Sequence, residues 1–158
     1  MRQTTAQYYR RGCLGLNSRE FYLRFPEGMP KGTQQEKGEC IRYRIENGRR
    51  VPYIHHYKKE NVSAARKEFE YKLKRYKPEK PTDAPVRLTV IFYFDIKEKK
   101  KWGHYKTKRP DASNLIKELE DSMTSLFWYD DSQVADLRVI KYYAESATIY
   151  IRVEELEP

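Results

Sequence analysis

The 158-residue chain has only two cysteines, and Cys13 and Cys40 show neither pairing nor metal-ligand spacing. A disulfide framework or a cysteine-based zinc site is therefore not expected. The chain also lacks an apolar run of about 18 residues, which argues against a transmembrane helix. Its polar start, Met-Arg-Gln-Thr-Thr, has no signal-peptide core. These absences predict one cytoplasmic domain over residues 1–158, without membrane contact, in which residues 1–18 form a flexible N-terminal arm.

Acidic residues are scarce in the first two thirds of the chain. Residues 1–109 hold 28 Lys and Arg against 12 Asp and Glu, a balance of +16, whereas residues 110–158 hold 4 against 11, a balance of −7. The net charge is +9. This division favours a polyanionic partner held by the first part and a cation held by the second. A generic basic surface is the alternative.

The hydrophobic pattern predicts an α+β fold in which two main helices pack on a small mixed or antiparallel sheet. Asn47-Gly48 is a hairpin turn signal between two strands. The apolar residues 86–96 are typical of a central strand, and the last two strands are expected to pair as a closing antiparallel hairpin. Asn61 is a candidate N-cap for the first helix. The expected strands span residues 19–25, 40–45, 51–55, 86–96, 133–143 and 147–153, and the helices span 61–76 and 110–127.

Two basic segments are candidates for contact with nucleic acid. The hairpin around residues 40–59 is rich in basic and aromatic residues and could lie along a phosphate backbone. The run from 97 to 109 carries seven basic residues and one acid, with Trp102 and Tyr105 available to stack on unpaired bases. A solvated loop is the alternative for the second segment. The candidate DNA contacts are Arg49, Arg50, Lys99, Lys100, Lys101, Lys106, Lys108 and Arg109.

The acidic part of the chain carries the candidate chemistry. Asp111 precedes the second helix, and Asp130-Asp131 follows it. Mg²⁺ prefers oxygen ligands and keeps several waters, so a few carboxylates and a substrate phosphate suffice to bind it. A metal held in this way can activate water for phosphodiester hydrolysis. On the helix between, one polar stripe carries Asn114, Lys117 and Asp121.

Each of these residues also has an ordinary structural explanation. Asp111 could be a helix cap, Asp130-Asp131 a turn, and Lys117 an exposed helix lysine. In that case the chain would be a generic basic RNA- or DNA-binding domain.

The pattern resembles the RusA family of Holliday junction resolvases, which occur in bacteria, phages and prophages. The resemblance rests on Pro110-Asp111-x-x-Asn114-Leu115-x-Lys117, then Asp121, then Phe127-Trp128-x-Asp130-Asp131-x-Gln133-Val134 and Lys141. It implies a homodimer that binds four-way DNA junctions and cuts two opposed strands with Mg²⁺, or with Mn²⁺ as a substitute, in DNA recombination and repair.

The resemblance also assigns roles to residues. Asp111 and Asp131 match the family's metal ligands, and Lys117 matches its essential lysine, so these three residues are the expected catalytic residues. Asp130, Ser113 and Asp121 are further candidate ligands. Asn114 and Gln133 support the motif.

Ser113 departs from the family pattern, which has a second aspartate at this position. A serine hydroxyl is neutral and a weak ligand for Mg²⁺, so its presence predicts weaker metal binding. Three explanations remain open. Asp130, Asp121 or Glu118 compensates for the missing carboxylate; the change inactivates the enzyme; or the protein binds junctions without cutting them. The expectation is a retained nuclease whose activity is impaired.

Overall fold

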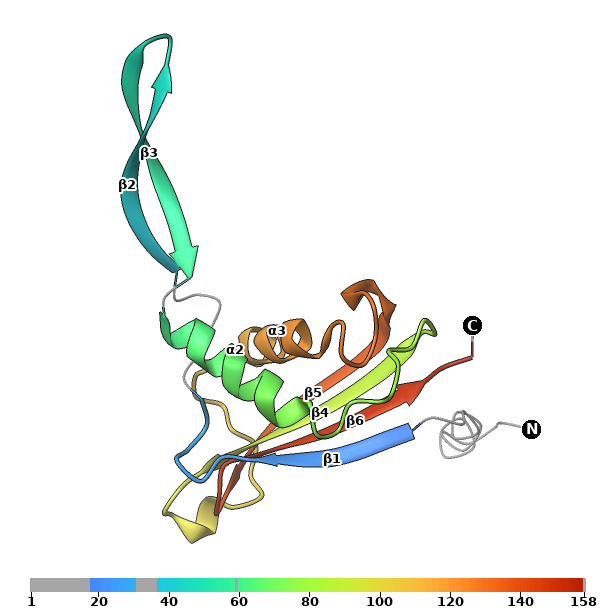
Figure 1. Ribbon diagram of the computed structural model, residues 1–158. Helices are drawn as coiled ribbons and strands as arrows, with labels where there is room; N and C mark the ends of the chain where they lie inside the picture. Colours follow the sequence, from blue (N-terminus) through green and yellow to red (C-terminus); the bar gives the residue numbers. More distant parts are fainter. Residues whose placement is uncertain (1–17, 31–36, 59, 158) are drawn as a thin grey trace, which may run out of the picture.

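The computed structural model describes residues 18–30, 37–58 and 60–157, and the expected N-terminal arm falls almost entirely outside them. Within these residues a four-stranded sheet has the order β1-β6-β4-β5. Two helices lie on one face of the sheet (Figure 1). The strands are β1 (Ser18–Arg24), β4 (Val86–Asp95), β5 (Val134–Ala144) and β6 (Thr148–Glu155), and the helices are α2 (Glu60–Leu73) and α3 (Ala112–Met123). The α+β prediction is confirmed.

Strand β4 occupies the interior of the sheet, as its apolar sequence predicts. It pairs with β6 in antiparallel and with β5 in parallel orientation. Every second residue points toward the helices, so Val86, Leu88, Val90 and Phe92 are fully buried. Their neighbours on the other face of the sheet are only partly buried. The core therefore lies between this sheet and the two helices.

The expected closing hairpin is wrong. Strands β5 and β6 follow each other in the chain, but β4 lies between them and pairs with both. Residues 145–147 connect them across the end of β4. The distance from β5 to β6 is about two strand spacings, which an extended chain of this length can span. Alternation alone identified both strands correctly but could not reveal which strand each one pairs with.

The helix boundaries also differ from expectation: α2 ends at Leu73 and not at Tyr76, and α3 begins at Ala112 and not at Pro110. Helix α2 begins at Glu60, so Asn61 lies inside the helix and is not its N-cap. Helix α3 ends at Met123 and does not continue to Phe127. The chain turns there because the amide of Ser125, a residue with positive φ, donates to the carbonyl of Trp128 at 2.7 Å. No helix in the described part of the chain has the length and apolar character needed to cross a membrane.

The remaining strands, β2 (Lys37–Glu46) and β3 (Arg49–Lys58), form a separate antiparallel hairpin. It projects away from the sheet and its helices (Figure 1). Asn47 and Gly48 at its tip both have positive φ, at 51° and 75°. These values fit a two-residue primed turn, as the Asn-Gly pair predicts.

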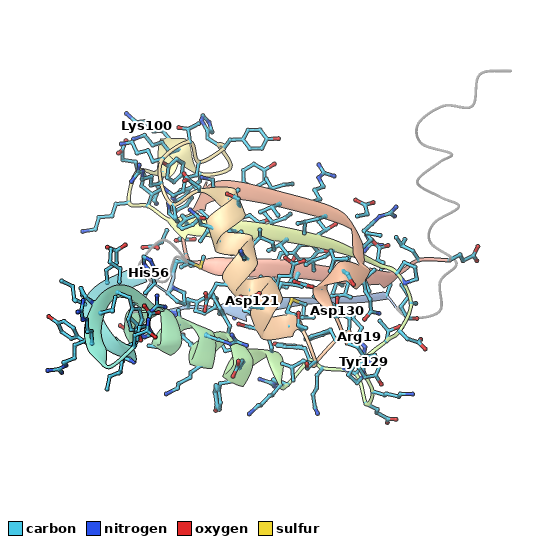
Figure 2. The ribbon with its side chains drawn as sticks, turned by 90° about the horizontal axis from the view of Figure 1, so that it is seen from above. Arg19, His56, Lys100, Asp121, Tyr129 and Asp130 are labelled. Carbon is cyan, nitrogen blue, oxygen red and sulfur yellow. The ribbon has the colours of Figure 1, made fainter. Side chains whose placement is uncertain are left out.

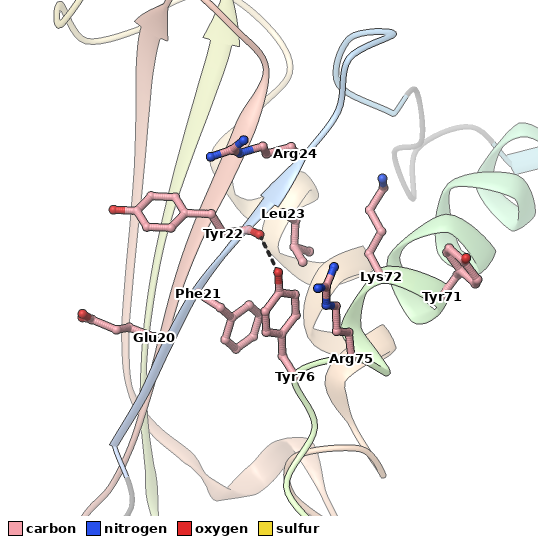
Figure 3. A pocket seen from close by; sticks show the side chains of 9 residues that line it. All are labelled: Glu20, Phe21, Tyr22, Leu23, Arg24, Tyr71, Lys72, Arg75 and Tyr76. Atoms are coloured by element: carbon pink, nitrogen blue, oxygen red, sulfur yellow. Dashed lines mark hydrogen bonds between the residues drawn. The ribbon is translucent and has the colours of Figure 1, made fainter.

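A depression of about 840 Å³ lies between β1 and α2, and it is remote from the predicted chemistry. Figure 3 shows Tyr76 in this depression, with its hydroxyl donating to the carbonyl of Tyr22 at 3.4 Å. Glu20 is the one carboxylate in its lining, and that group accepts a bond from Tyr150. None of the residues predicted to act on DNA or metal borders it.

Candidate active site

Helix α3, strand β5 and the short 3-10 helix η3 (Asp131–Gln133) enclose a depression of about 400 Å³. It brings Lys117 and Asp121 from the helix together with Asp131 from the segment after it. Four of the residues predicted for the site, Ser113, Lys117, Asp121 and Asp131, therefore share one surface, three of them from α3 and one from η3. The lining consists of Ala112, Ser113, Ile116, Lys117, Glu120, Asp121, Asp131, Leu137 and Val139.

The turn before β5 fixes where Asp131 lies. Asp130 caps η3: its Oδ1 accepts from the amide of Ser132 at 2.9 Å and also from the Ser132 hydroxyl. These bonds favour the ionised carboxyl and lower the pKa of Asp130. Asp130 thus directs its carboxylate into its own turn, whereas Asp131 lines the depression. Figure 2 shows Asp130 beside the end of α3 that carries Asp121.

Gln133 connects this turn to the chain that precedes β4. Its Oε1 accepts from the amides of Tyr129 and Asp130, both at 2.9 Å. Its Nε2 donates to the carbonyls of Thr82 at 2.9 Å and Ala84 at 3.1 Å. Both ends of the amide are therefore used, and aspartate or glutamate could not replace the donor. The motif glutamine acts here as a positioning residue for the segment that carries Asp131.

The aromatic pair of the motif anchors the same segment in the core. Phe127 and Trp128 are 2% and 0% exposed. The indole Nε1 of Trp128 donates to the hydroxyl of Thr124 at 3.2 Å, so its buried polar atom is satisfied. Asp130 and Asp131 lie between the buried Phe127-Trp128 pair and the hydrogen-bonded Gln133, so the backbone that carries them is fixed at both ends.

Asp111 lies at the N-cap of α3, as predicted, but its side chain makes no capping hydrogen bond. Its carbonyl accepts from the amide of Leu115 at 3.1 Å, and its carboxylate stays exposed. It is adjacent in sequence to the depression but does not line it. Lys141 holds the segment that precedes Asp111, because its Nζ donates to the carbonyls of Pro110 at 2.7 Å and Lys108 at 3.2 Å.

Glu120 is a site residue that the sequence reasoning missed. It is half-buried in the depression, and its pKa is raised by burial first and then by the negative charges of Asp131 and Asp121. Lys117 acts in the opposite direction. Helical spacing could have revealed it, because Ser113, Lys117 and Glu120 lie at i, i+4 and i+7 on one side of α3.

Glu118, considered as a compensating ligand, does not line the depression. Its side chain is 1% exposed and lies inside the fold. It is one of the charges that raise the pKa of Arg66 on α2. Helix α3 therefore turns Glu118 toward the interior and Glu120 toward the site.

The lining combines apolar side chains with the carboxylates of Glu120, Asp121 and Asp131, and these carboxylates suit a hard cation. The mutual repulsion that raises the pKa of Glu120 is the kind of unfavourable interaction that a bound cation would relieve. Within the described residues, however, no three Asp, Glu, His or Cys side chains already converge closely enough to hold a metal. Mg²⁺ needs only one or two carboxylates when waters and substrate phosphates complete its shell. The residues present therefore fit a Mg²⁺ ion whose ligands come from both the protein and the substrate.

The description of the matching family model is "Endodeoxyribonuclease RusA", and the match covers residues 27–154 of this chain. The chain belongs to the RusA family. In this RusA-family member, three residues of the motif, Lys117, Asp121 and Asp131, line one depression.

The chain is also similar to two curated proteins. The crossover junction endodeoxyribonuclease rusA of Lactococcus phage r1t is 44% identical over 75 residues, which are 47% of this chain and 57% of that protein. The uncharacterized protein YqaN of Bacillus subtilis strain 168 is 31% identical over 93 residues, 52% of this chain and 66% of that protein. The chain matches less than two thirds of the length of each.

The predicted DNA-contact residues of this RusA-family chain are spread over three places. Lys99, Lys100 and Lys101 form the 3-10 helix η2. Figure 2 shows Lys100 of this turn well away from Asp130. Lys101 pairs with Glu98 at 2.7 Å.

The second group lies close to the start of α3. The Nζ of Lys106 lies over the rings of Phe94 and Tyr143, 5.0 and 5.3 Å from their centroids. Its pKa is lowered by burial and then by the charges of Lys141 and Lys108. Such a cluster of positive charge near the start of α3 is suited to a phosphate. Arg109 follows in the same segment, and Asn114 lies half-buried on α3 outside the lining.

The third place is the hairpin, where Arg49 and Arg50 lie on opposite faces. Residues directly opposite each other in an antiparallel pair share a face. Arg49 pairs with Glu46 in the register, and Arg50 pairs with Ile45. The guanidinium of Arg50 lies over the ring of Tyr43, 5.1 Å from its centroid. The two arginines therefore lie on opposite faces of the ribbon.

Proposed function

We propose that this protein is a metal-dependent endonuclease that resolves Holliday junctions and related branched DNA. The observation that carries the proposal is the shared depression of Lys117, Asp121 and Asp131 in a chain that belongs to the RusA family. The charge division supports it as well, because residues 1–109 carry a balance of +16 and residues 110–158 a balance of −7. Participation in recombination and repair, a prophage origin and a cytoplasmic location remain predictions from the resemblance and the composition.

Asp131 and Asp111 are the proposed ligands of Mg²⁺ or Mn²⁺, and Asp121 and Glu120 are placed to take part. The bound ion would supply a Lewis acid for the scissile phosphate and lower the pKa of an attacking water. Lys117 projects from the same helix face and stabilises the additional negative charge that develops on the phosphate oxygens in the transition state. Asp130 and Gln133 position the segment of Asp131 and do not touch the substrate.

The DNA is held by the basic segments around the site. Lys106, Lys108 and Arg109 approach the start of α3, and they contact the phosphates next to the scissile bond. Lys99, Lys100 and Lys101 contact a more distant part of the same arm. Each phosphate that these side chains neutralise releases counterions, so affinity for a junction falls steeply as salt rises. Two opposed strands are cut by a homodimer, because a two-fold protein matches a two-fold junction.

A second candidate function is junction binding with little or no cleavage. Ser113 motivates it, because this neutral side chain lines the depression where the family pattern has a carboxylate. If this alternative is correct, Ser113→Asp creates cleavage in a protein that lacks it. If the protein already cuts and Asp131→Asn abolishes the cutting, the alternative fails.

The proposal is tested by incubating the purified protein with a synthetic four-way junction and Mg²⁺. Paired nicks in opposed strands, absent from a linear duplex of the same sequence, are expected. Binding of the junction without nicks at any Mg²⁺ or Mn²⁺ concentration would overturn the nuclease proposal.

A further inference from the structure

The two edges of the four-stranded sheet differ in how they are covered. At the β5 edge, residues 103–106 run beside the end of the strand. The amides of Gly103 and Lys106 donate to carbonyls of β5 at 2.8 and 2.9 Å, and the amide of Tyr143 in β5 donates to the carbonyl of His104 at 3.0 Å. At the β1 edge, no strand in the described part of the chain pairs with the outer side. An unpaired edge of this kind is a template for another extended chain.

The register shows which backbone groups of β1 point away from the sheet. The amide of Phe25, directly after the strand, donates to a carbonyl just before β6 at 3.0 Å. Residues that bond across an antiparallel pair alternate with residues whose amides and carbonyls point outward. Glu20, Tyr22 and Arg24 are therefore the outward residues. In agreement, the carbonyl of Tyr22 accepts from the hydroxyl of Tyr76 at 3.4 Å, a long bond that leaves its second lone pair available.

The depression beside this edge is positively charged. Figure 3 shows Lys72 and Arg75 on the α2 side of it and Arg24 near the end of β1. Arg24 and Arg75 have no acidic partner among the described residues, and the ammonium of Lys72 lies 3.7 Å from the carboxylate of Glu68. The single carboxylate of the lining, Glu20, is already hydrogen-bonded to β6. The depression therefore offers more positive charge than its own acids neutralise.

We propose that this edge and depression bind an extended acidic segment of a partner protein, which joins β1 as an additional strand and alternates acidic with apolar residues. Side chains of an added strand alternate between its two faces. Those turned toward α2 meet Lys72 and Arg75, which select carboxylates. Those on the other face lie beside Tyr22, and pairs of aromatic and β-branched side chains across strands are favourable. The backbone bonds supply affinity, and the side-chain pattern supplies specificity.

A peptide fits the edge better than a nucleic acid does. The outward groups of β1 alternate amide donors with carbonyl acceptors, whereas phosphate oxygens can only accept. A phosphate backbone along this edge places its charges against the outward carbonyls of β1. The start of this chain is also a poor occupant, because residues 1–17 contain three arginines and no acid. An acidic segment of another protein satisfies both the backbone groups and the charge.

A partner held in this way leaves the candidate active site accessible. Strands β1 and β5 are the opposite edges of the sheet. The site lies against β5, α3 and η3, and none of its lining residues borders the β1 depression. The β1 edge can therefore attach the protein to a partner while the site remains open. The inference stands independently of the nuclease proposal.

The first test measures peptide binding to the full chain by fluorescence anisotropy. The probe is a labelled peptide of about eight residues, close to the length of β1, in which aspartate or glutamate alternates with valine. The comparison peptide has the same composition, with all its acids at one end. The alternating peptide is expected to bind at least about tenfold more tightly, because all its acids lie on one face of a strand. Equal affinities, or no binding of either peptide, overturn the inference.

The second test locates the charges that select the peptide. Lys72→Gln combined with Arg75→Gln is expected to weaken binding of the alternating peptide about fivefold. The matched control, Lys67→Gln with Lys74→Gln, removes the same charge from exposed lysines outside the lining and is expected to stay within about twofold of the parent. If the two double variants weaken binding equally, the attraction is general and the inference is wrong.

The third test examines the added strand itself. Tyr22→Pro removes one outward amide and spares the bonds to β6, a position at which edge strands tolerate proline. It is expected to weaken binding about fivefold relative to Tyr22→Val, which loses the same ring but keeps the amide. Amide hydrogen exchange of the parent, followed by NMR, needs no variant. The amides of Glu20, Tyr22 and Arg24 are expected to exchange more slowly when the peptide is bound. Unchanged exchange at all three overturns strand addition.

These outcomes are separable from those of the nuclease proposal. Specific peptide binding by a protein that never cuts junctions supports this inference and refutes the nuclease. Junction cleavage without peptide binding does the reverse. Duplex DNA that displaces the peptide, and that itself binds more weakly after Lys72→Gln with Arg75→Gln but not after the control pair, identifies the depression as a DNA surface and overturns the inference.

Discussion

Replacing Ser113 by aspartate adds one carboxylate to the depression at the second residue of α3. Ser113 is exposed and lines the depression together with Lys117 and Asp131. The substitution therefore introduces no buried charge and no steric conflict with the core. We expect it to increase both Mg²⁺ affinity and the rate of junction cleavage.

The effect on stability should be small because the contributions oppose each other. A negative charge in the first turn of a helix contributes about 0.3–1 kcal/mol, and its i,i+4 pairing with Lys117 about 0.2–0.5 kcal/mol. Repulsion from Asp131 and Glu120 acts against both. The net change in the free energy of unfolding should lie within about 1 kcal/mol of zero in the absence of metal.

The effect on metal binding should be larger. Two unit charges 4 Å apart interact by about 4 kcal/mol at an effective dielectric constant of 20, and much of this is offset by dehydration of the ion. If about 1.4 kcal/mol remains, Mg²⁺ binds about tenfold more tightly. Cleavage should then reach half its maximal rate at about a tenth of the Mg²⁺ concentration that the parent needs.

The assay is junction cleavage over a Mg²⁺ titration, with calorimetric Mn²⁺ binding as a readout independent of activity. Ser113→Asn is the matched control, because asparagine has the shape of aspartate without its charge. It should leave metal affinity near that of the parent. If Ser113→Asp and Ser113→Asn behave alike in both measurements, the depression is not the metal site.

Three further substitutions test how the site is built. Gln133→Ala removes four hydrogen bonds and should lower the free energy of unfolding by about 2–4 kcal/mol, measured by urea denaturation; no loss would refute its positioning role. Glu120→Gln should raise stability near pH 7, because ionisation of a carboxyl with a raised pKa is unfavourable in the fold; the gain should vanish near about pH 4, where Glu120 is largely protonated. The same variant should bind Mn²⁺ more weakly, and an unchanged affinity would remove Glu120 from the site. Lys141→Met breaks the bonds to Pro110 and Lys108 and should cost about 1–3 kcal/mol. It should also raise the pKa of Lys106, measured by side-chain NMR, and an unchanged pKa would contradict the electrostatic coupling.

Local patterns predicted the elements well because each depends on short-range chemistry. The Asn47-Gly48 pair specifies its hairpin turn whatever surrounds it. The alternation from Val86 onward identifies a strand with one buried face, and its apolar character on both faces explains why it lies inside the sheet.

Local sequence patterns do not predict which strands pair or which residues form long-range hydrogen bonds. The parallel pairing of β5 with β4 depends on packing across the whole sheet, and the sequence of β5 is equally compatible with a hairpin. The role of Gln133 depends on carbonyls 49 and 51 residues away. Glu120 lies outside the family motif, although its helical spacing from Lys117 already predicts that it shares the same side of α3.

The central claim is that the depression between α3 and η3 is a metal-dependent nuclease site. The most direct test compares the parent with Asp131→Asn on a four-way junction in Mg²⁺, with junction binding measured in parallel. The claim predicts paired nicks by the parent and intact binding without nicks by the variant. Equal cleavage by both proteins would contradict it.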